Sequence, residues 1–345
     1  MAGSKNKNSD IVAVAKAARV SPSTVSRAFN HPDLVKATTR KRIDAAVRRL
    51  GYIRNRAART IHGIRSGTIG LIVPTIDHTI FAELIQSFSD AVGEQGFTIL
   101  LASHDYSLEQ EYALTRKMLE HRVDGMALIG IEHARDTYVL LDQQNIPAIL
   151  LWNVDEGSPL PCVGSDNYLA GRLIGDHLTG LGHRDVAALF PPLGGNDRAG
   201  RRFSGMMDAL NTAGFDIHAY RRLETTYSIS DAKRAVLGLI SEGPMPSAIL
   251  CGNDVLAWGA LHALARAGAH VPGDVSVTGI GDFKGSREME PPLTTVRIPA
   301  QQIGIRGAQM IIASITGSDT DPQNALLAPE LKVRATCRAV RVSWR

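Results

Sequence analysis

Three arginines stand close together in the segment GGNDRAGRRFSG, where Arg198, Arg201 and Arg202 open a predicted helix. A guanidinium group donates two parallel hydrogen bonds to a planar carboxylate or phosphate. The cluster therefore predicts a binding site for an acidic small molecule. The alternative is that Arg198 and Arg201 only face solvent.

The sequence motifs of common enzymes are absent or incomplete. GIGDFKG, at residues 279–285, lacks the GxGxxG spacing of a dinucleotide site and does not follow a first strand. The sequence contains no GxSxG motif, P-loop or metal-spaced histidines. The three cysteines, Cys162, Cys251 and Cys337, stand singly, without the spacing of a zinc site or a disulfide framework. We therefore expect no enzyme, no cofactor and no metal.

The charges are distributed unevenly along the 345 residues. Residues 1–62 carry 14 Lys/Arg against 3 Asp/Glu, whereas the rest of the chain carries 24 against 31. A basic head on an acidic body is typical of a nucleic-acid-binding domain joined to a domain with another role. A solvated basic tail would show the same charge. The helical pattern of the head therefore has to distinguish a folded DNA-binding domain from such a tail.

Three short helices are predicted in the head. The first covers DIVAVAKAA, with Asp10 as its N-cap. The second begins after Ser21, about one turn beyond the end of the first. The third, TTRKRIDAAVRRL, opens at Thr38 or Thr39 and stops at Gly51. Two helices joined by a tight turn, with a third beside them, indicate a helix-turn-helix domain.

The second helix of such a domain lies in the major groove of DNA, so its first turn and outer face meet the bases. Arg27 is assigned to a base or backbone contact, because arginine pairs with guanine edges. Val25 is expected in the core, and a core position is also the alternative for Thr24. The predicted contacts of this helix are Ser21, Pro22, Ser23, Thr24, Ser26, Arg27 and Asn30, with Ser21, Thr24 and Asn30 nearer the phosphates.

The strings AVAKAARVSPSTVSRAFN and TTRKRIDAAVRRLGYIRNRAAR resemble the DNA-binding head of the lactose/galactose-repressor (LacI/GalR) family, and the resemblance extends over residues 10–338. It implies a hinge helix at residues 55–61 that folds on DNA and inserts an apolar side chain into the minor groove. Ile61 stands at this lever position in place of the usual Leu, and Arg54 stands where Pro is common. A plain basic linker is the alternative. The implied hinge contacts are Asn55, Arg56, Ala58, Arg59 and Ile61.

From Thr68 onward, short runs rich in Val, Ile and Leu alternate with helical stretches, and the pattern repeats after residue 165. Examples are TIGLIVP and FTILLAS in the first half, and SAILCG and VSVTGIG in the second. Buried strands that alternate with helices indicate parallel sheets built from β-α-β units. The predicted fold is multidomain: an all-α helix-turn-helix head and an α/β sensor of two parallel-sheet subdomains, which the family resemblance implies is similar to periplasmic binding proteins.

The predicted boundaries follow from these patterns. They are 8–54 for the head, 55–67 for the hinge helix and linker, and 68–340 for the sensor. The N-subdomain is assigned to about 68–165 and 294–325, and the C-subdomain to about 166–293 and 326–340. The chain is expected to cross between them near Asp166, near 280–292 and near the last strand.

Ligands of parallel sheets bind beyond the carboxyl ends of the strands, so the cleft between the subdomains is the predicted effector site. For each carboxylate there, a helix or loop cap is the alternative. Trp152 is either a core aromatic or a stacking wall for a sugar-like ring. The predicted effector contacts are Thr75, Asp77, Phe81, Trp152, Asn153, Asp166, Arg198, Arg202, Asn253 and Asp282.

The resemblance also implies the partners: a pseudo-palindromic operator in double-stranded DNA and a small effector. A homodimer is expected because one head offers too few base contacts for useful specificity. The family's sugar-contacting arginine falls on Gly200 and its partner aspartate on Gly281, which argues against simple neutral-sugar recognition. Together with the arginines this predicts a sugar acid or similar carboxylate, which controls a regulator that is a repressor by family default. No apolar run suits a membrane helix or a secretory signal, so a cytoplasmic protein is expected and a periplasmic solute-binding protein is not.

Overall fold

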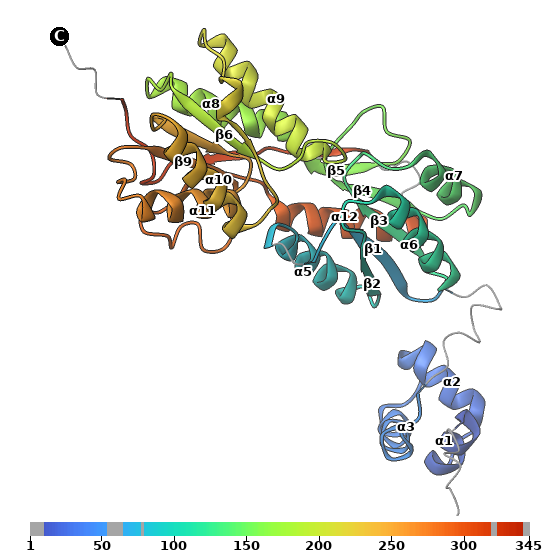
Figure 1. Cartoon of the computed structure of the whole chain (residues 1–345). Coiled ribbons are helices and arrows are strands. Elements are labelled where there is room, and N and C mark those ends of the chain that lie inside the picture. Colours follow the sequence, from blue (N-terminus) through green and yellow to red (C-terminus); the bar gives the residue numbers. More distant parts are fainter. Residues whose placement is uncertain (1–9, 54–64, 77–78, 319–322, 341–345) are drawn as a thin grey trace, which may run out of the picture. The chain divides into compact units, whose positions relative to one another are not determined.

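The computed structural model describes residues 10–53, 65–76, 79–318 and 323–340 (Figure 1). The chain divides into two compact units, Met1–Ser66 and Gly67–Arg345. The first unit contains the predicted head and the second contains the predicted sensor.

The described part of the first unit contains the helices α1 (Ile11–Ala18), α2 (Pro22–Asn30) and α3 (Ala37–Leu50), with a 3-10 turn η1 (Pro32–Leu34). The side chains of Asp10 and Ser21 cap α1 and α2, because they accept hydrogen bonds from backbone N–H groups that lack a partner within the helix. Arg19 ends α1 in the left-handed conformation, at φ 54°, and so makes the tight turn to α2. The side chains of Val14 and Ile43 are fully buried where the helices pack. The predicted helix-turn-helix fold is confirmed.

The first sheet of the second unit is entirely parallel, in the order β11-β5-β4-β3-β1-β2. Its strands are β1 (Thr68–Val73), β2 (Thr98–Ser103), β3 (Gly125–Ile129), β4 (Ala148–Trp152), β5 (Cys162–Ser165) and β11 (Ala325–Leu327). The helices α5 (Thr79–Glu94) and α12 (Ala300–Thr316) pack side by side on one face, although they lie far apart in the sequence (Figure 1). The helices α6 (Leu108–Glu120) and α7 (Arg135–Gln143) cover the other face.

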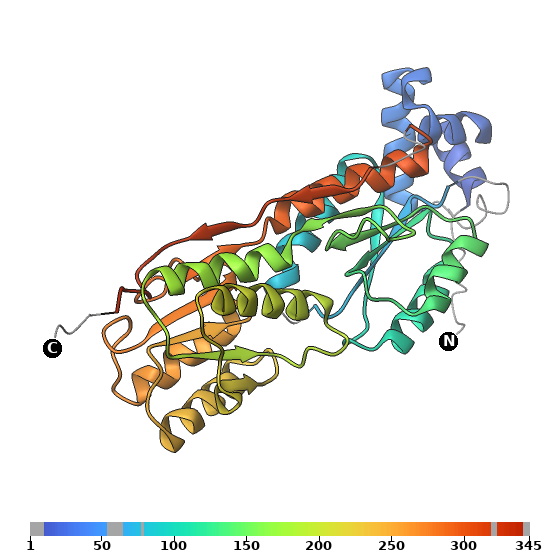
Figure 2. The same ribbon diagram turned by 90° about the horizontal axis from the view of Figure 1, so that it is seen from above.

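The second sheet has the order β12-β10-β9-β8-β6-β7, and β12 alone of its described strands runs antiparallel. Its strands are β6 (Val186–Phe190), β7 (Arg222–Glu224), β8 (Ala248–Cys251), β9 (Ser276–Gly281), β10 (Thr294–Arg297) and β12 (Glu330–Lys332). The helices α8 (Asn167–Gly180) and α9 (Asp197–Thr212) pack together, as do α10 (Ile229–Glu242) and α11 (Asp254–Arg266), and a 3-10 turn η2 (Ala219–Arg221) precedes β7 (Figure 2). The predicted sensor of two α/β subdomains is confirmed.

The chain crosses between the two sheets at residues 165–167, 298–299 and 328–329. The second of these corrects the sequence prediction, which places the crossing at 280–292 and returns residues from 294 to the N-subdomain. Thr294 instead pairs with Thr278 of β9, so β10 belongs to the second sheet and the crossing follows it. The reason is that β10, which is buried except for Arg297, continues the parallel hydrogen-bonding pattern of β9. Because β9 also pairs with β8, it has no free edge.

Two glycines let α8 and α9 approach closely. A Cβ atom at Gly171 of α8 would lie 1.9 Å from the carbonyl oxygen of Arg202, and one at Gly205 of α9 would lie 1.9 Å from that of Tyr168. Only a residue without a side chain fits at such a backbone contact. This packing fixes the position of Arg202, which the sequence assigns to the effector site.

Candidate DNA-reading helix and effector cleft

One face of α2 is polar and exposed, and the opposite face is core. Ser21, Pro22, Ser23 and Arg27 are exposed, whereas Val25 is fully buried, as the sequence predicts. The hydroxyl of Ser21 lies 2.8 Å from the hydroxyls of both Ser23 and Thr24. Hydroxyl groups and free N–H groups at a helix N-terminus are suited to phosphate oxygens, and the exposed arginine is suited to a base edge.

Several predicted contacts fall outside the described residues. They are the side chain of Asn30, the hinge residues Asn55, Arg56, Ala58, Arg59 and Ile61, and the effector candidate Asp77. Ser26 is partly buried and Thr24 is partly exposed. Within the described part of the head, the predicted DNA-contacting side chains are therefore those on the polar face of α2.

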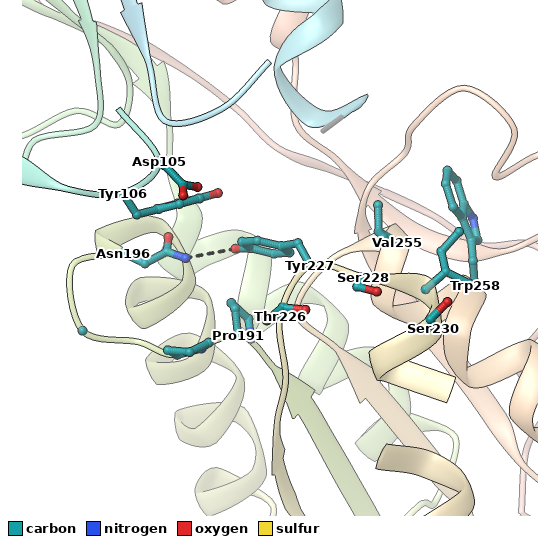
Figure 3. Close-up of a pocket in the computed structure, with 13 residues that line it drawn as sticks. Asp105, Tyr106, Pro191, Asn196, Thr226, Tyr227, Ser228, Ser230, Val255 and Trp258 are labelled. Carbon is teal, nitrogen blue, oxygen red and sulfur yellow. Dashed lines mark hydrogen bonds between the residues drawn. The ribbon is translucent and has the colours of Figure 1, made fainter. Parts of the chain in front are cut away.

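A cavity of about 670 Å³ opens between the two sheets, at the carboxyl ends of their strands (Figure 3). Asp105 and Tyr106, which follow β2, line it from the first subdomain. The second subdomain contributes the segments after β6 and β7 and the start of α11, including Asn196, Tyr227 and Trp258. The cleft predicted from the strand pattern is thus present as a cavity at the predicted edge of the sheets.

Two tyrosines from opposite subdomains face each other in this cavity. The rings of Tyr106 and Tyr227 are stacked, with centroids 6.2 Å apart and planes inclined by 29°. The Nδ2 group of Asn196 donates a hydrogen bond of 3.1 Å to the hydroxyl of Tyr227 (Figure 3). The ordinary tyrosine pKa of 10 already keeps the Tyr106 hydroxyl protonated at neutral pH, and burial raises this pKa further, so the hydroxyl can donate a hydrogen bond.

The rest of the lining is mostly uncharged and combines apolar side chains with a few polar ones. Thr226, Ser228 and Ser230 offer hydroxyl groups, and the indole N–H of Trp258 is buried without a hydrogen-bond partner among the described residues. Asp105 is the one charged residue of the thirteen described residues that line the cavity. Aromatic faces combined with a few polar groups are typical of a small-molecule binding site.

Two parts of the chain match known families. Residues 10–55 match the bacterial regulatory proteins of the lacI family, and residues 66–335 match the periplasmic binding proteins and sugar binding domain of the LacI family. The second match covers well over half of the chain. This protein belongs to the LacI family. LacI-family proteins are DNA-binding transcriptional regulators and not enzymes, and the predictions of a regulator and of no enzymatic activity are confirmed.

Individual LacI-family proteins are similar over almost the whole length. The HTH-type transcriptional repressor PurR of Erwinia tasmaniensis is 30% identical over 320 residues, which cover 92% of this chain and 94% of PurR. The lac repressor dimer bound to operator and the anti-inducer ONPF has a TM-score of 0.83 at 26% identity, covering 96% of this chain and 100% of that one. The CelR-cellobiose complex has a TM-score of 0.70 at 27% identity, covering 95% and 99%.

The arginines of this LacI-family sensor do not form the predicted cluster. Nη1 of Arg198 lies 2.7 Å from Oδ1 of Asp197. Arg202 is 1% exposed, and it donates from Nε to Asn167 and from Nη1 to the carbonyl of Gly252. Neither side chain is among those that line the cavity. Neighbouring groups of the protein therefore accept from Nη1 of Arg198 and from Nε and Nη1 of Arg202, whereas Nη2 of Arg202 has no hydrogen-bond partner among the described residues.

The predicted polar contacts at other strand ends are helix caps or ion pairs. Asp166 caps α8 and Asn253 caps α11 through backbone N–H groups. The carboxylate of Asp282 accepts hydrogen bonds from Arg297 (2.8 Å) and Arg334 (2.5 Å), and its side chain is 3% exposed. The alternative of a cap therefore applies to Asp166, and Asp282 joins the ends of β9, β10 and β12 instead of facing the cavity.

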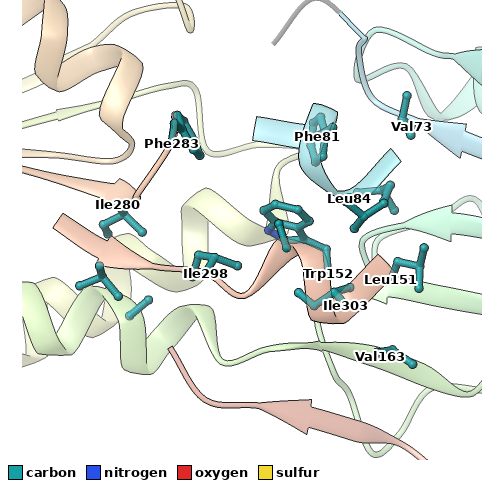
Figure 4. Close-up of a cluster of buried hydrophobic side chains, with 14 of the residues drawn as sticks. Val73, Phe81, Leu84, Leu151, Trp152, Val163, Ile280, Phe283, Ile298 and Ile303 are labelled. Carbon is teal, nitrogen blue, oxygen red and sulfur yellow. The ribbon is translucent and has the colours of Figure 1, made fainter. Parts of the chain in front are cut away.

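Trp152 and Phe81 fill the cleft near the crossings. The indole of Trp152 is 1% exposed and meets the ring of Phe81 edge-to-face, with centroids 5.2 Å apart. Phe283 and Ile298 approach from the second subdomain in the same apolar cluster (Figure 4). Trp152 is thus buried like a core aromatic in this arrangement of the subdomains, and it also lines a smaller cavity, of about 490 Å³, together with Phe283 and Ile298. Asn153 is buried beside Trp152, and Thr75 follows β1 in a partly exposed position.

Sequence reasoning missed Tyr106, Asn196, Tyr227 and Trp258. Tyr106 follows a strand that was predicted, so the loop after that strand was an available signal. Tyr227 follows β7, whose three residues, RLE, contain no apolar run that could have indicated a strand.

Within the described residues, no group of three or more His, Cys, Asp or Glu is placed to hold a metal ion. No described helix has the length and apolar character needed to cross a membrane.

Proposed function

We propose that this LacI-family protein acts as a homodimeric repressor of a pseudo-palindromic operator, and that a small molecule in the Tyr106–Tyr227 cavity sets its affinity for DNA. The observation that carries the proposal is that the two tyrosines belong to opposite subdomains. A ligand between them contacts both subdomains and so favours one of their relative arrangements. A repressor of this kind acts in the cytoplasm, where the operator lies.

The lining favours an uncharged ring that carries hydroxyl groups. Aromatic faces suit the C–H faces of a sugar ring, and the hydroxyl groups together with the amide of Asn196 suit its hydroxyls. A carboxylate would lie near Asp105 and find no arginine or lysine among the described lining residues. The related CelR structure is a cellobiose complex, which agrees with this class of effector.

A sugar acid is the second candidate, and one observation favours it. Nη2 of Arg202 is buried without a hydrogen-bond partner among the described residues. A buried unpaired donor of a charged group is unfavourable, and an anionic ligand would satisfy it. For this to happen the ligand has to reach Arg202, which lies close enough to both tyrosines to interact with them electrostatically.

A thermal-shift screen with matched pairs separates the two candidates. Each neutral sugar is tested beside its own acid, for example glucose beside gluconate and glucuronate. A ligand at 100 times its dissociation constant stabilises the protein by about 2.7 kcal/mol. Stabilisation by the neutral member alone supports the uncharged effector, and stabilisation by the acid alone supports the second candidate.

Two variants locate the binding site and connect it to DNA. Tyr227→Ala should abolish the shift caused by the active compound, whereas Tyr220→Ala, which removes an exposed tyrosine of the same subdomain, should leave it unchanged. The compound should also change the affinity for a DNA duplex that the wild-type protein selects from a random library. Equal shifts in both variants, or an unchanged DNA affinity, would contradict the proposal.

A further inference from the structure

One carboxylate joins the two subdomains directly. Asp197, the first residue of α9, belongs to the second subdomain. Its Oδ2 atom accepts hydrogen bonds from the backbone N–H of Ile131 (2.9 Å) and from Nδ2 of Asn153 (2.7 Å). Both donors belong to the first subdomain, where they follow β3 and β4. Because the acceptor is charged and its side chain is only 10% exposed, these bonds are stronger than ordinary surface hydrogen bonds.

The surroundings of Asp197 hold its carboxylate in place. Oδ1 accepts hydrogen bonds from the backbone N–H (2.8 Å) and from Nη1 (2.7 Å) of Arg198. Gly130 allows this close approach, since a Cβ atom there would lie 2.5 Å from Nη1 of Arg198. Its φ of 101° also lies in the region that favours glycine. The first subdomain therefore offers Asp197 a shaped receptor made of Gly130, Ile131 and Asn153.

The contact made by Asp197 lies at a distance from the crossing about which the subdomains would rotate. The nearest crossing leaves the first sheet at β5, and the neighbouring strands in order are β4 and β3. At about 4.8 Å between neighbouring strands, the bond to Ile131 lies roughly 10 Å from that crossing. Asn153 also bonds through Oδ1 to Nδ2 of Asn167, which lies at the crossing itself. A bond farther from the pivot is stretched more by the same rotation, so Asp197 resists opening more than Asn167 does.

We infer that Asp197 is a latch between the subdomains: a positioning residue that holds the sensor closed, and whose release is one step in the signal from the cavity to the head. The latch itself is independent of the effector. Only its consequence for DNA binding rests on the proposed control by subdomain movement.

Amide hydrogen exchange of the full chain tests the latch without any ligand. In Asp197→Asn the exchange at Ile131 should accelerate about ten-fold or more, because a charged acceptor is replaced by an amide. Exchange in β6, residues 186–190, should stay at the wild-type rate, which separates a released latch from general destabilisation. The matched control is Asp208→Asn on the same helix, whose carboxylate accepts from Tyr168 within the second subdomain. It should leave Ile131 unchanged.

Asn153→Ala tests the same contact from the other subdomain and serves if Asp197→Asn does not fold. Both variants should also change the affinity for the selected DNA duplex about five-fold or more in the same direction, and Asp208→Asn should not. Wild-type exchange at Ile131 in both variants would overturn the latch. Faster exchange with unchanged DNA affinity would overturn its part in signalling. A failure to find an effector would bear on the proposed function alone.

Discussion

The buried carboxylate of Asp254 accepts a hydrogen bond of 2.6 Å from the hydroxyl of Thr295, which lies 41 residues further along the chain. It also accepts bonds from the backbone N–H of Phe283 (2.8 Å) and the hydroxyl of Ser286 (2.6 Å). Three donors from the segment that leads to the second crossing therefore converge on the first turn of α11. Burial raises the pKa of Asp254, and the three hydrogen bonds oppose that effect.

Replacing Asp254 by Ala should destabilise the protein by about 3–5 kcal/mol, because the backbone N–H and two hydroxyl groups are left buried without their acceptor. Glu242→Ala removes an exposed carboxylate of the same subdomain, at the end of α10, and should change stability by less than about 0.5 kcal/mol. Chemical denaturation of both variants measures the difference. Similar stabilities would show that Asp254 does not fix this segment.

Gly171→Ala should destabilise the protein by about 3 kcal/mol, since the new Cβ atom would lie 1.9 Å from a carbonyl oxygen of α9 and the two helices would have to separate. Gly180→Ala, in the same helix, meets no atom within 4 Å and should be neutral or stabilise by less than about 1 kcal/mol. Thermal unfolding of the pair checks the contrast. Only a small loss of stability in Gly171→Ala would mean that α8 and α9 adjust easily.

Arg27→Ala should weaken binding to the selected DNA duplex about ten- to hundred-fold, which is the usual effect of losing a base-contacting arginine. The stability of the head should not change, because Arg27 is exposed and the core face of α2 is formed by Val25 and Ala28. Arg135→Ala, which removes an arginine from the sensor, is the control for charge and should bind DNA as the wild type does. Fluorescence anisotropy at fixed salt measures all three proteins. Equal affinities would exclude Arg27 from the interface.

Stability should fall as the pH decreases through about 6.5. Burial lowers the pKa of His104, His177 and His183 from the ordinary value of 6.5. Between the lowered pKa values and 6.5 the unfolded chain binds more protons than the folded chain, so acid favours unfolding, while the full stability from these groups is present above pH 6.5. The melting temperature should therefore rise from pH 5.5 to pH 7.5.

His183→Gln should flatten this pH dependence, because it removes one of the buried neutral imidazoles. His183 donates through Nε2 to the carbonyl of Arg338 and is 2% exposed, whereas His218 is exposed. His218→Gln should keep the wild-type slope. The melting temperatures of the three proteins are measured across the pH range. Identical slopes for His183→Gln and the wild type would show that His183 does not contribute to the pH dependence.

The local elements and their order could be predicted from the sequence because their signals are local. A capping side chain such as Ser21, with proline in the next position, marks the start of α2 whatever packs against it. Alternating apolar runs and helical stretches indicate two mostly parallel sheets in the same way. Short or weakly patterned elements carry no such signal: β7 has no apolar run, and β10 was assigned to the wrong subdomain because pairing partners are not encoded in one strand's own residues.

The sequence by itself determined a basic helix-turn-helix head, an α/β sensor and membership of a regulator family, since composition, periodicity and contiguous motifs carry that information. Only the tertiary structure decided which polar groups are free to meet a ligand. Arg198, Arg202 and Asp282 have the residue types of a binding site, but each is bonded to a neighbour that lies adjacent in space. Tyr106 and Tyr227 are 121 positions apart in the chain and become a site only when the two sheets face each other. The physical reason is that hydrogen-bond capacity is a property of a side chain, whereas its availability depends on every group that folding brings beside it.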